Sequence, residues 1–178
     1  MGAELIELVR KAREGNAEAF GELYEQYSKE MYLYAVSIVG NSAAAQDAVS
    51  DAVLEAFKSI KSLRDETSFK GWLFKILNAS CRRQFNEFNK NLPLEDFYTV
   101  PDIDGVAEKD SALDLEKALE ILSPDDRQIV IMKAVYGMSS EEMSEALSMP
   151  GSTVRSKLKR SLEKLRQYLG KEDSDDDR

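Results

Sequence analysis

The sequence predicts an all-α fold of two helical domains joined by an acidic linker, the second domain being a helix-turn-helix. Apolar residues recur three and four positions apart over most of the chain, the spacing of one side of an α-helix. Capping residues and glycines mark where these segments begin and end. Acidic residues, proline and glycine replace the pattern at 91–111. We therefore expect domains at 1–90 and 112–170, a linker at 91–111, and an acidic tail without structure at 171–178.

Four helices are expected in the first domain. A short helix spans Ala3–Glu14, and a long amphipathic one spans Ala17–Val39. Ser42 is the expected cap of the third, whose buried side includes Phe57. A fourth helix is expected over Phe69–Asn89. Small residues on the third helix permit close antiparallel packing against the second.

The second domain has the helix start and stop signals of a helix-turn-helix. Ser123 precedes a proline and two aspartates, which is a typical helix start. Ser139 and Glu142 form a capping box that opens a short second helix. A Met-Pro-Gly break follows, and a third helix begins near Ser152. A short helix, a tight turn and a longer helix are what a helix-turn-helix needs to read the major groove.

The third of these helices carries an apolar stripe and a basic side. The stripe, expected to be buried, consists of Val154, Leu158, Leu162, Leu165 and Leu169. Between 152 and 166 there are six basic residues and one acidic residue. A solvated basic face explains this helix alone equally well, but the cap, helix and elbow before it favour DNA binding. The candidate DNA contacts on this helix are Ser152, Thr153, Arg155, Ser156, Lys159 and Arg160. Arg127 and Lys157 are candidates for phosphate contacts.

The distribution of charge predicts weak binding to DNA by the chain alone. The net charge is -9, with acidic residues concentrated in the linker and the tail, whereas 124–170 is net positive. Because phosphate contacts supply most nonspecific affinity, such a chain needs a partner to hold it on DNA.

Several classes of function are excluded by composition. The chain has one cysteine, Cys81, and no histidine, so it cannot form an internal disulfide and lacks the usual zinc ligands. No nucleophile, base and orienting group stand together in a motif, so no catalytic residues and no cofactor are expected. No apolar run approaches membrane-spanning length and no signal-peptide pattern is present, so we expect a cytoplasmic protein without membrane insertion or a small-molecule substrate.

Three segments of the second domain resemble a known family. They are Leu122–Arg127, Tyr136–Glu142 and Pro150–Leu158. They are similar to the C-terminal domain of bacterial sigma factors of the extracytoplasmic function (ECF) type, the small two-domain members of the sigma-70 family. The resemblance implies a transcription initiation factor, not an enzyme, whose second domain reads the upstream (minus 35) promoter element.

One helix of the first domain has an acidic side. By spacing alone this side is best explained as solvated surface. The segment 45–57, however, resembles the part of the family that binds the clamp helices of the largest subunit of core RNA polymerase. The resemblance thereby implies a polymerase contact, and it implies a second one with the flap of the second-largest subunit. The acidic side consists of Asp47, Ser50, Asp51 and Glu55.

The fourth helix begins with the most recognisable segment. Phe69–Ile76 is similar to the family motif that reads and melts the downstream (minus 10) promoter element. Without the resemblance, a core tryptophan with scattered surface lysines would be favoured. The sequence departs from the family where Ala79 replaces a usual asparagine, with Asn78 one position early. The candidate minus 10 contacts are Ser68, Phe69, Lys70, Trp72, Lys75, Asn78 and Arg82.

The chain is thus identified as a member of the ECF sigma factors, which implies binding to core polymerase, promoter DNA and an anti-sigma factor. The acidic linker resembles the segment that threads polymerase channels. Two alternatives remain open: a repressor or activator that binds a two-fold DNA site without polymerase, and a helical adaptor that binds only protein.

Overall fold

The computed structural model describes residues 2–88, 118–119 and 121–175. In these residues the chain is helical and has no strand, which confirms the all-α class. The expected linker and the first turns of the second domain lie outside the described residues. The helices are α1 (Ala3–Arg13), α2 (Ala17–Val39), α3 (Ser42–Ser59), α4 (Phe69–Phe88), α6 (Pro124–Ala134), α7 (Ser140–Leu147) and α8 (Gly151–Asp175), with 3₁₀ turns η1 (Ile60–Ser62) and η2 (Glu66–Ser68).

Side-chain caps position the helices of the first domain. The Asn16 side chain accepts a hydrogen bond from the Ala19 amide at the start of α2. Asn41 caps α3 in the same way, so the expected cap at Ser42 is wrong by one residue. Asn41 has extended backbone, whereas Ser42 is already helical. Gly40, with φ of 68°, ends α2 in the left-handed conformation that favours glycine.

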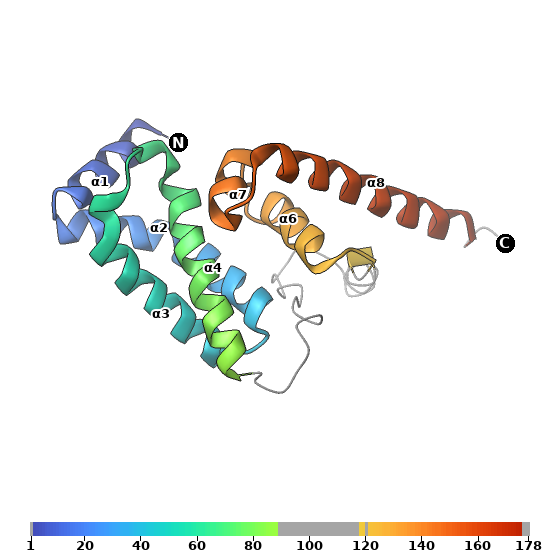
Figure 1. Cartoon of the computed structure of the whole chain (residues 1–178), viewed down its shortest axis with the longest axis horizontal. Coiled ribbons are helices and arrows are strands. Elements are labelled where there is room, and N and C mark those ends of the chain that lie inside the picture. The colour runs from blue at the N-terminus through green and yellow to red at the C-terminus, as the bar shows by residue number, and fades with distance from the viewer. Residues whose placement is uncertain (1, 89–117, 120, 176–178) are drawn as a thin grey trace.

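The first domain packs α2, α3 and α4 together, with α1 against α2 (Figure 1). Its core side on α3 is built from alanines, which allow the backbones to approach closely. Phe57, expected in the core, is 48% exposed, and its ring meets the Phe20 ring edge-to-face with centroids 5.2 Å apart. Leu54 is 57% exposed. The alanine side is narrow, and these two larger residues lie outside it.

The second domain begins as expected. The Ser123 hydroxyl accepts a hydrogen bond from the Asp126 amide, and both hydrogen bonds of the capping box at Ser139 and Glu142 are present. The expected unstructured tail is wrong in its first five residues, because α8 continues through Asp175. Extending an existing helix costs much less than nucleating one, so a helix already formed by the preceding residues can continue into the tail.

The apolar stripe of α8 is only partly buried. Val154 and Leu165 are buried, whereas Leu162 is 46% and Leu169 is 40% exposed, contrary to expectation. The reason is length: α8 has 25 residues and its partners α6 and α7 have 11 and 8. The far part of α8 extends away from both (Figure 1).

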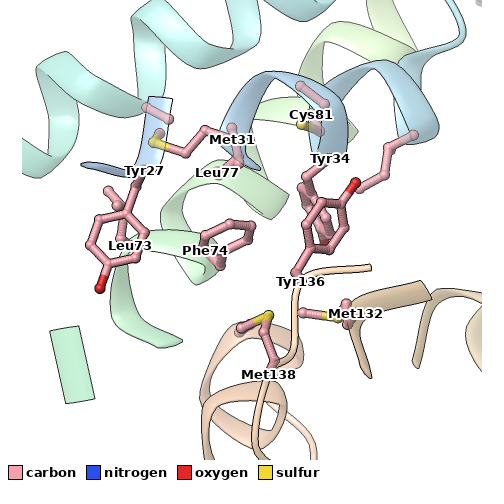
Figure 2. Packing of buried hydrophobic residues seen from close by; sticks show 14 of the residues in the cluster. Tyr27, Met31, Tyr34, Leu73, Phe74, Leu77, Cys81, Met132, Tyr136 and Met138 are labelled. Atoms are coloured by element: carbon pink, nitrogen blue, oxygen red, sulfur yellow. The ribbon is translucent and has the colours of Figure 1, made fainter. Parts of the chain in front are cut away.

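The two domains are docked on one another, which the sequence did not predict. Helix α4 packs closely against α7, and the buried apolar residues of both domains form one cluster. Figure 2 shows Met132, Tyr136 and Met138 of the second domain lying against the cluster of the first. The Tyr136 ring meets the Tyr34 ring edge-on with centroids 5.9 Å apart, and it lies 6.2 Å from the Phe74 ring.

Candidate nucleic-acid interfaces

The recognition side of α8 is open to solvent. Ser152, Arg155, Ser156, Lys159 and Arg160 are all exposed, and Thr153 is half-buried. We call these six residues the α8 surface.

The turn before α8 fixes its direction. The Ser144 hydroxyl donates to the Met149 carbonyl at 2.6 Å, and the Met149 amide donates to the Ser144 carbonyl at 3.0 Å. Amides of the first turn of α8 then donate to the Pro150 carbonyl. This elbow holds α7 and the start of α8 together as one unit, which is the geometry of a helix-turn-helix.

Positive charge on the α8 surface is only loosely paired. An Arg155 guanidinium nitrogen lies 3.6 Å from a Glu141 carboxylate oxygen, and the Lys159 ammonium lies 4.0 Å from Glu163. All four side chains are more than half exposed. Such pairs are weak in water, so these cations can exchange their partners for phosphate or guanine at little cost.

The two expected phosphate contacts are instead structural. Arg127 donates from Nε to the Leu119 carbonyl at 2.9 Å. The Lys157 ammonium lies 2.8 Å from Asp126 and 4.0 Å from Asp125, which joins α8 to the start of α6. Burial raises the pKa of Asp126, but hydrogen bonds from Lys157 and Ser123 outweigh it and leave that pKa below its ordinary value. Both side chains are held by their own domain in this structure, and their expected contacts with phosphate stay predictions.

The second domain contacts part of the polar side of α4, although Lys75 and Arg82 stay exposed. The Lys70 ammonium donates to the Tyr136 carbonyl at 2.9 Å and lies 2.8 Å from the Glu30 carboxylate. The Lys75 ammonium lies 3.1 Å from Glu145 of α7. We call Lys70, Gly71, Phe74, Lys75 and Asn78 the α4 face.

A buried hydrogen-bond network joins the domains. The Tyr34 hydroxyl donates to Asn78 Oδ1 at 3.1 Å, and Gln128 Nε2 donates to the Tyr34 hydroxyl at 2.5 Å and to Asn78 Oδ1 at 3.3 Å. Asn78 and Gln128 are 7% and 2% exposed. Asn78 was expected to face DNA, but here its carbonyl oxygen accepts from both domains.

The other residues that were expected to contact the minus 10 element differ in how far they are buried. Phe69 is 1% exposed, and its ring lies 5.8 Å from the Tyr27 ring and 5.9 Å from the Trp72 ring. Phe69 is therefore a core residue in this structure, and its expected contact with bases stays a prediction. Ser68 and Trp72 are half-buried. Arg82 is exposed.

The acidic side of α3 faces solvent beside a groove. Asp47, Ser50 and Glu55 are exposed, whereas Asp51 accepts hydrogen bonds from Arg83 at 3.2 Å and Gln84 at 3.3 Å of α4. A groove of about 490 Å³ runs between α3 and α4. Its lining includes Leu54, Glu55, Trp72 and Ile76. No role was expected for Leu54 from the sequence, and its exposure beside the groove is seen only in the structure.

Burial also defines the remaining candidates. Cys81 is fully buried, and desolvation raises the pKa of its thiol to about 12, so it is an apolar residue and not a nucleophile.

Within the described ranges, no group of acidic, cysteine or histidine side chains could hold a metal ion. None of the helices in those ranges combines the length and apolarity needed to cross a membrane.

Comparison with protein families matches both domains. The family model "Sigma-70 region 2" matches residues 23–87, and "Sigma-70, region 4" matches residues 112–165. The chain is 32% identical over 166 residues to the ECF RNA polymerase sigma factor SigE of Mycolicibacterium smegmatis, covering 88% of this chain and 64% of that protein. It is 28% identical over 158 residues to the ECF RNA polymerase sigma factor SigM of Mycobacterium tuberculosis, covering 88% and 80%.

Two solved structures share the fold. CnrH in complex with the cytosolic domain of CnrY has a TM-score of 0.67 and 21% identity, with 93% of this chain and 97% of that chain covered. The sigma factor RpoE in complex with the anti-sigma factor NepR from Bartonella quintana has a TM-score of 0.67 and 22% identity, with 86% and 98% covered.

Proposed function

The chain belongs to the sigma-70 family, among its ECF sigma factors, and on that premise we propose that it binds core RNA polymerase and directs it to specific promoters. The observation that carries this proposal is the ordered pair of family domains, each with its own candidate binding surface. The chain acts by binding and performs no bond chemistry. Its place of action is the cytoplasm, where polymerase and promoter DNA meet.

The α8 surface reads the minus 35 element. Its exposed arginine and lysine side chains have the lengths and donors to reach guanine edges and phosphates. Arg155 and Arg160 supply base discrimination, and Lys159 supplies phosphate attraction. This assignment is supported by the exposure of all three and by the weakness of the ion pairs that Arg155 and Lys159 make.

The exposed side of α3 binds core polymerase at the clamp helices. Asp47, Ser50 and Glu55 supply a polar, acidic rim, and Leu54 supplies an apolar centre beside the groove. An apolar centre with a polar rim is the usual anatomy of a protein interface. Asp51 supports this surface indirectly, because it ties α3 to α4. The second domain contacts the polymerase flap.

The α4 side of the first domain captures the melted minus 10 element. Trp72 offers a ring for base stacking, and Lys70, Lys75 and Arg82 offer charge to the backbone. Polymerase fixes the separation of the two DNA-reading domains, so two weak contacts combine into a specific one. This agrees with the low DNA affinity expected of the free acidic chain.

An anti-sigma factor is the proposed regulatory partner. The support is the fold shared with CnrH and RpoE, which are described in complexes with CnrY and the anti-sigma factor NepR.

Run-off transcription from a genomic fragment library tests the proposed function. Purified core polymerase is assayed with and without the chain, and new start sites are mapped. We expect discrete starts that share an upstream and a downstream element. DNA binding by the chain alone, without new starts, would instead support a repressor or activator.

A further inference from the structure

We propose that Arg13, the last residue of α1, is a positioning residue for the loop before α4, and that α1 thereby helps to select bases at the minus 10 element. This 64–68 loop includes Ser68, an expected minus 10 contact. The proposal rests on the proposed function for its effect on base selection, whereas the contact between α1 and the loop is a property of the free chain.

The 64–68 loop is anchored at both ends by core residues. Leu63 before it and Phe69 after it are 4% and 1% exposed. Helix α4 begins at Phe69, directly after the 3₁₀ turn η2, so the loop lies at the start of the helix expected to meet melted bases. Anchored ends fix where the loop begins and ends, but the residues between them need contacts of their own to keep one conformation.

Helix α1 supplies a contact that holds the middle of the loop. The Arg13 guanidinium donates a hydrogen bond to the Glu66 carboxylate and forms an ion pair with it, 53 positions away in sequence. The two side chains are 29% and 28% exposed. The pair is therefore shielded from water better than the ion pair between Arg10 and Glu7 on the outer side of the same helix, and it should hold its partners more firmly.

The Arg13 side chain is committed to this contact. Its Nε atom is buried, and no described residue accepts a hydrogen bond from it. Because an unpaired buried donor is costly, the Glu66 carboxylate is what keeps the guanidinium in this place. Removal of Arg13 would leave a partly buried carboxylate without its cation, and Glu66 would regain water by moving outward with the loop backbone.

A second carboxylate gives the loop its internal shape. Asp65 accepts hydrogen bonds from the Thr67 hydroxyl at 2.7 Å, the Thr67 amide at 2.9 Å and the Ser68 hydroxyl at 3.4 Å. The bonds from Thr67 lower the pKa of Asp65, so this carboxylate is charged at neutral pH. The loop is thus shaped from within by Asp65, and Arg13 holds that shape against the rest of the domain.

The position of the loop matters more for base selection than for attraction to DNA. A base taken out of the stack is recognised by donors and acceptors at fixed places, so a displaced loop loses discrimination. Attraction to phosphates comes from basic side chains, whose long-range effect depends less on exact placement. We therefore expect loss of Arg13 to relax the preference for minus 10 bases while most of the attraction to DNA remains.

This role lies outside the part of the first domain that the family model covers. The region 2 model matches residues 23–87, whereas α1 ends at Arg13. Helix α1 nevertheless packs against α2 and against both 3₁₀ turns that flank the loop's start and end. The first domain of this chain therefore includes a helix beyond the matched range, and that helix touches the loop.

Run-off transcription on promoters that differ only in the minus 10 element tests the proposal. In Arg13→Ala we expect the preference for the favoured minus 10 sequence to fall about five-fold or more, the discrimination that one well-read base contributes. Preference at the minus 35 element should not change. Arg10→Ala is the matched control, since Arg10 is exposed on the same helix and pairs with Glu7 of α1. Equal minus 10 preference in the two variants would overturn the proposal.

Exchanging the two charges tests whether Arg13 acts through Glu66. Arg13→Glu and Glu66→Arg should each relax minus 10 preference, and the double variant should recover most of it. Arg13→Lys keeps the charge but loses the guanidinium geometry, so its preference should lie between those of wild type and Arg13→Ala. A double variant that has the circular dichroism spectrum of wild type but recovers no preference would contradict a role through Glu66.

Hydrogen exchange separates this inference from the proposed function. The Thr67 and Ser68 amides donate to the Asp65 side chain and carbonyl, so their exchange reports on the order of the loop. By mass spectrometry on the free chain, this segment should exchange faster in Arg13→Ala than in wild type or Arg10→Ala. Equal exchange in all three would show that α1 does not hold the loop. If wild type starts no transcription under any condition, the proposed function fails, whereas exchange still decides whether Arg13 holds the loop.

Discussion

The α8 surface and the α4 face both carry basic residues on amphipathic helices, but these basic residues have different partners. On α8, Lys159 pairs with a residue four positions away on the same helix, and the pair is mostly exposed. On α4, Lys70 and Lys75 contact residues of the other domain. An amphipathic pattern in the sequence therefore identifies the polar side of a helix but does not say what that side touches.

A second difference between the two regions lies in the hydrogen-bond partners of their polar side chains. On the α8 surface, Ser156 and Arg160 donate to carbonyl oxygens of their own helix and stay exposed. Around α4, Tyr34, Asn78 and Gln128 satisfy one another in a buried network. Because an unpaired polar group in such a place is costly, this network favours one arrangement of the domains over others.

The largest expected effect is on the free energy of unfolding, and its size should differ between the α4 face and the α8 surface. Phe74 is fully buried, so Phe74→Ala should lower the free energy of unfolding by about 3–5 kcal/mol. Lys159→Ala, a change on the open surface, should alter it by about 0.5 kcal/mol or less. Urea denaturation followed by circular dichroism measures both. Similar losses for the two variants would show that the α4 face is not buried in solution.

The next effect concerns recognition and should appear only on the open surface. Arg160→Ala should cost roughly 1–3 kcal/mol of promoter discrimination at the minus 35 element, because an arginine that reads a base edge contributes that much. Run-off assays on promoter variants measure it. Lys61→Ala, which removes one exposed charge from the first domain, is the control. Unchanged preference in the Arg160 variant would remove this residue from the recognition surface.

An effect of similar or smaller size is expected from the buried hydrogen-bond network between the domains, as a coupling between Asn78 and Gln128. Asn78→Ala and Gln128→Ala each remove one partner, and a double-mutant cycle should give a coupling of roughly 0.5–3 kcal/mol in the free energy of unfolding. The reason is the direct 3.3 Å hydrogen bond between these side chains. The pair Lys159 and Glu163 is the exposed comparison, for which we expect less coupling. Additive effects at Asn78 and Gln128 would mean that the domains are apart in solution.

The smallest effect depends on pH and concerns the link between α6 and α8. Because the pKa of Asp126 lies below its ordinary 3.8 in the folded chain, its contribution is complete above that value and is lost as pH falls through the folded pKa. Asp126→Asn should cost about 1 kcal/mol or less at neutral pH, and the difference from wild type should shrink on acidification. Thermal unfolding from pH 7 to below 3.8 measures it, with Glu163→Gln as control. A difference that stays constant with pH would exclude this ion pair as the cause.

Local signals in the sequence predicted most of the helices. Ser123, Ser139 and Glu142 cap the helices at which they were expected, because a cap is a short-range hydrogen bond between neighbours in sequence. The exposure of Arg155, Ser156 and Arg160 followed from the period of the apolar stripe on their helix. Errors of one residue, as at Ser42, arise because two adjacent polar residues compete for the same cap.

Expectations about burial were less successful, for reasons that involve distant residues. Phe57 and Leu162 were expected in the core because they fall on apolar stripes, but no described partner helix extends over them enough to bury them. Lys157 was expected to face phosphate, yet Asp126 of another helix holds it. In each case the missing information was the length or charge of a neighbouring helix.

The sequence by itself determined the helices, most of their caps, the helix-turn-helix and the family, because each depends on residues near one another in the chain. Only the tertiary structure decided that Gly71 touches the backbone of α7 and that Asn78 is buried beside Gln128. Those contacts join residues far apart in sequence. A helical pattern shows which side of a helix is polar, but it does not show which distant residues that side will contact.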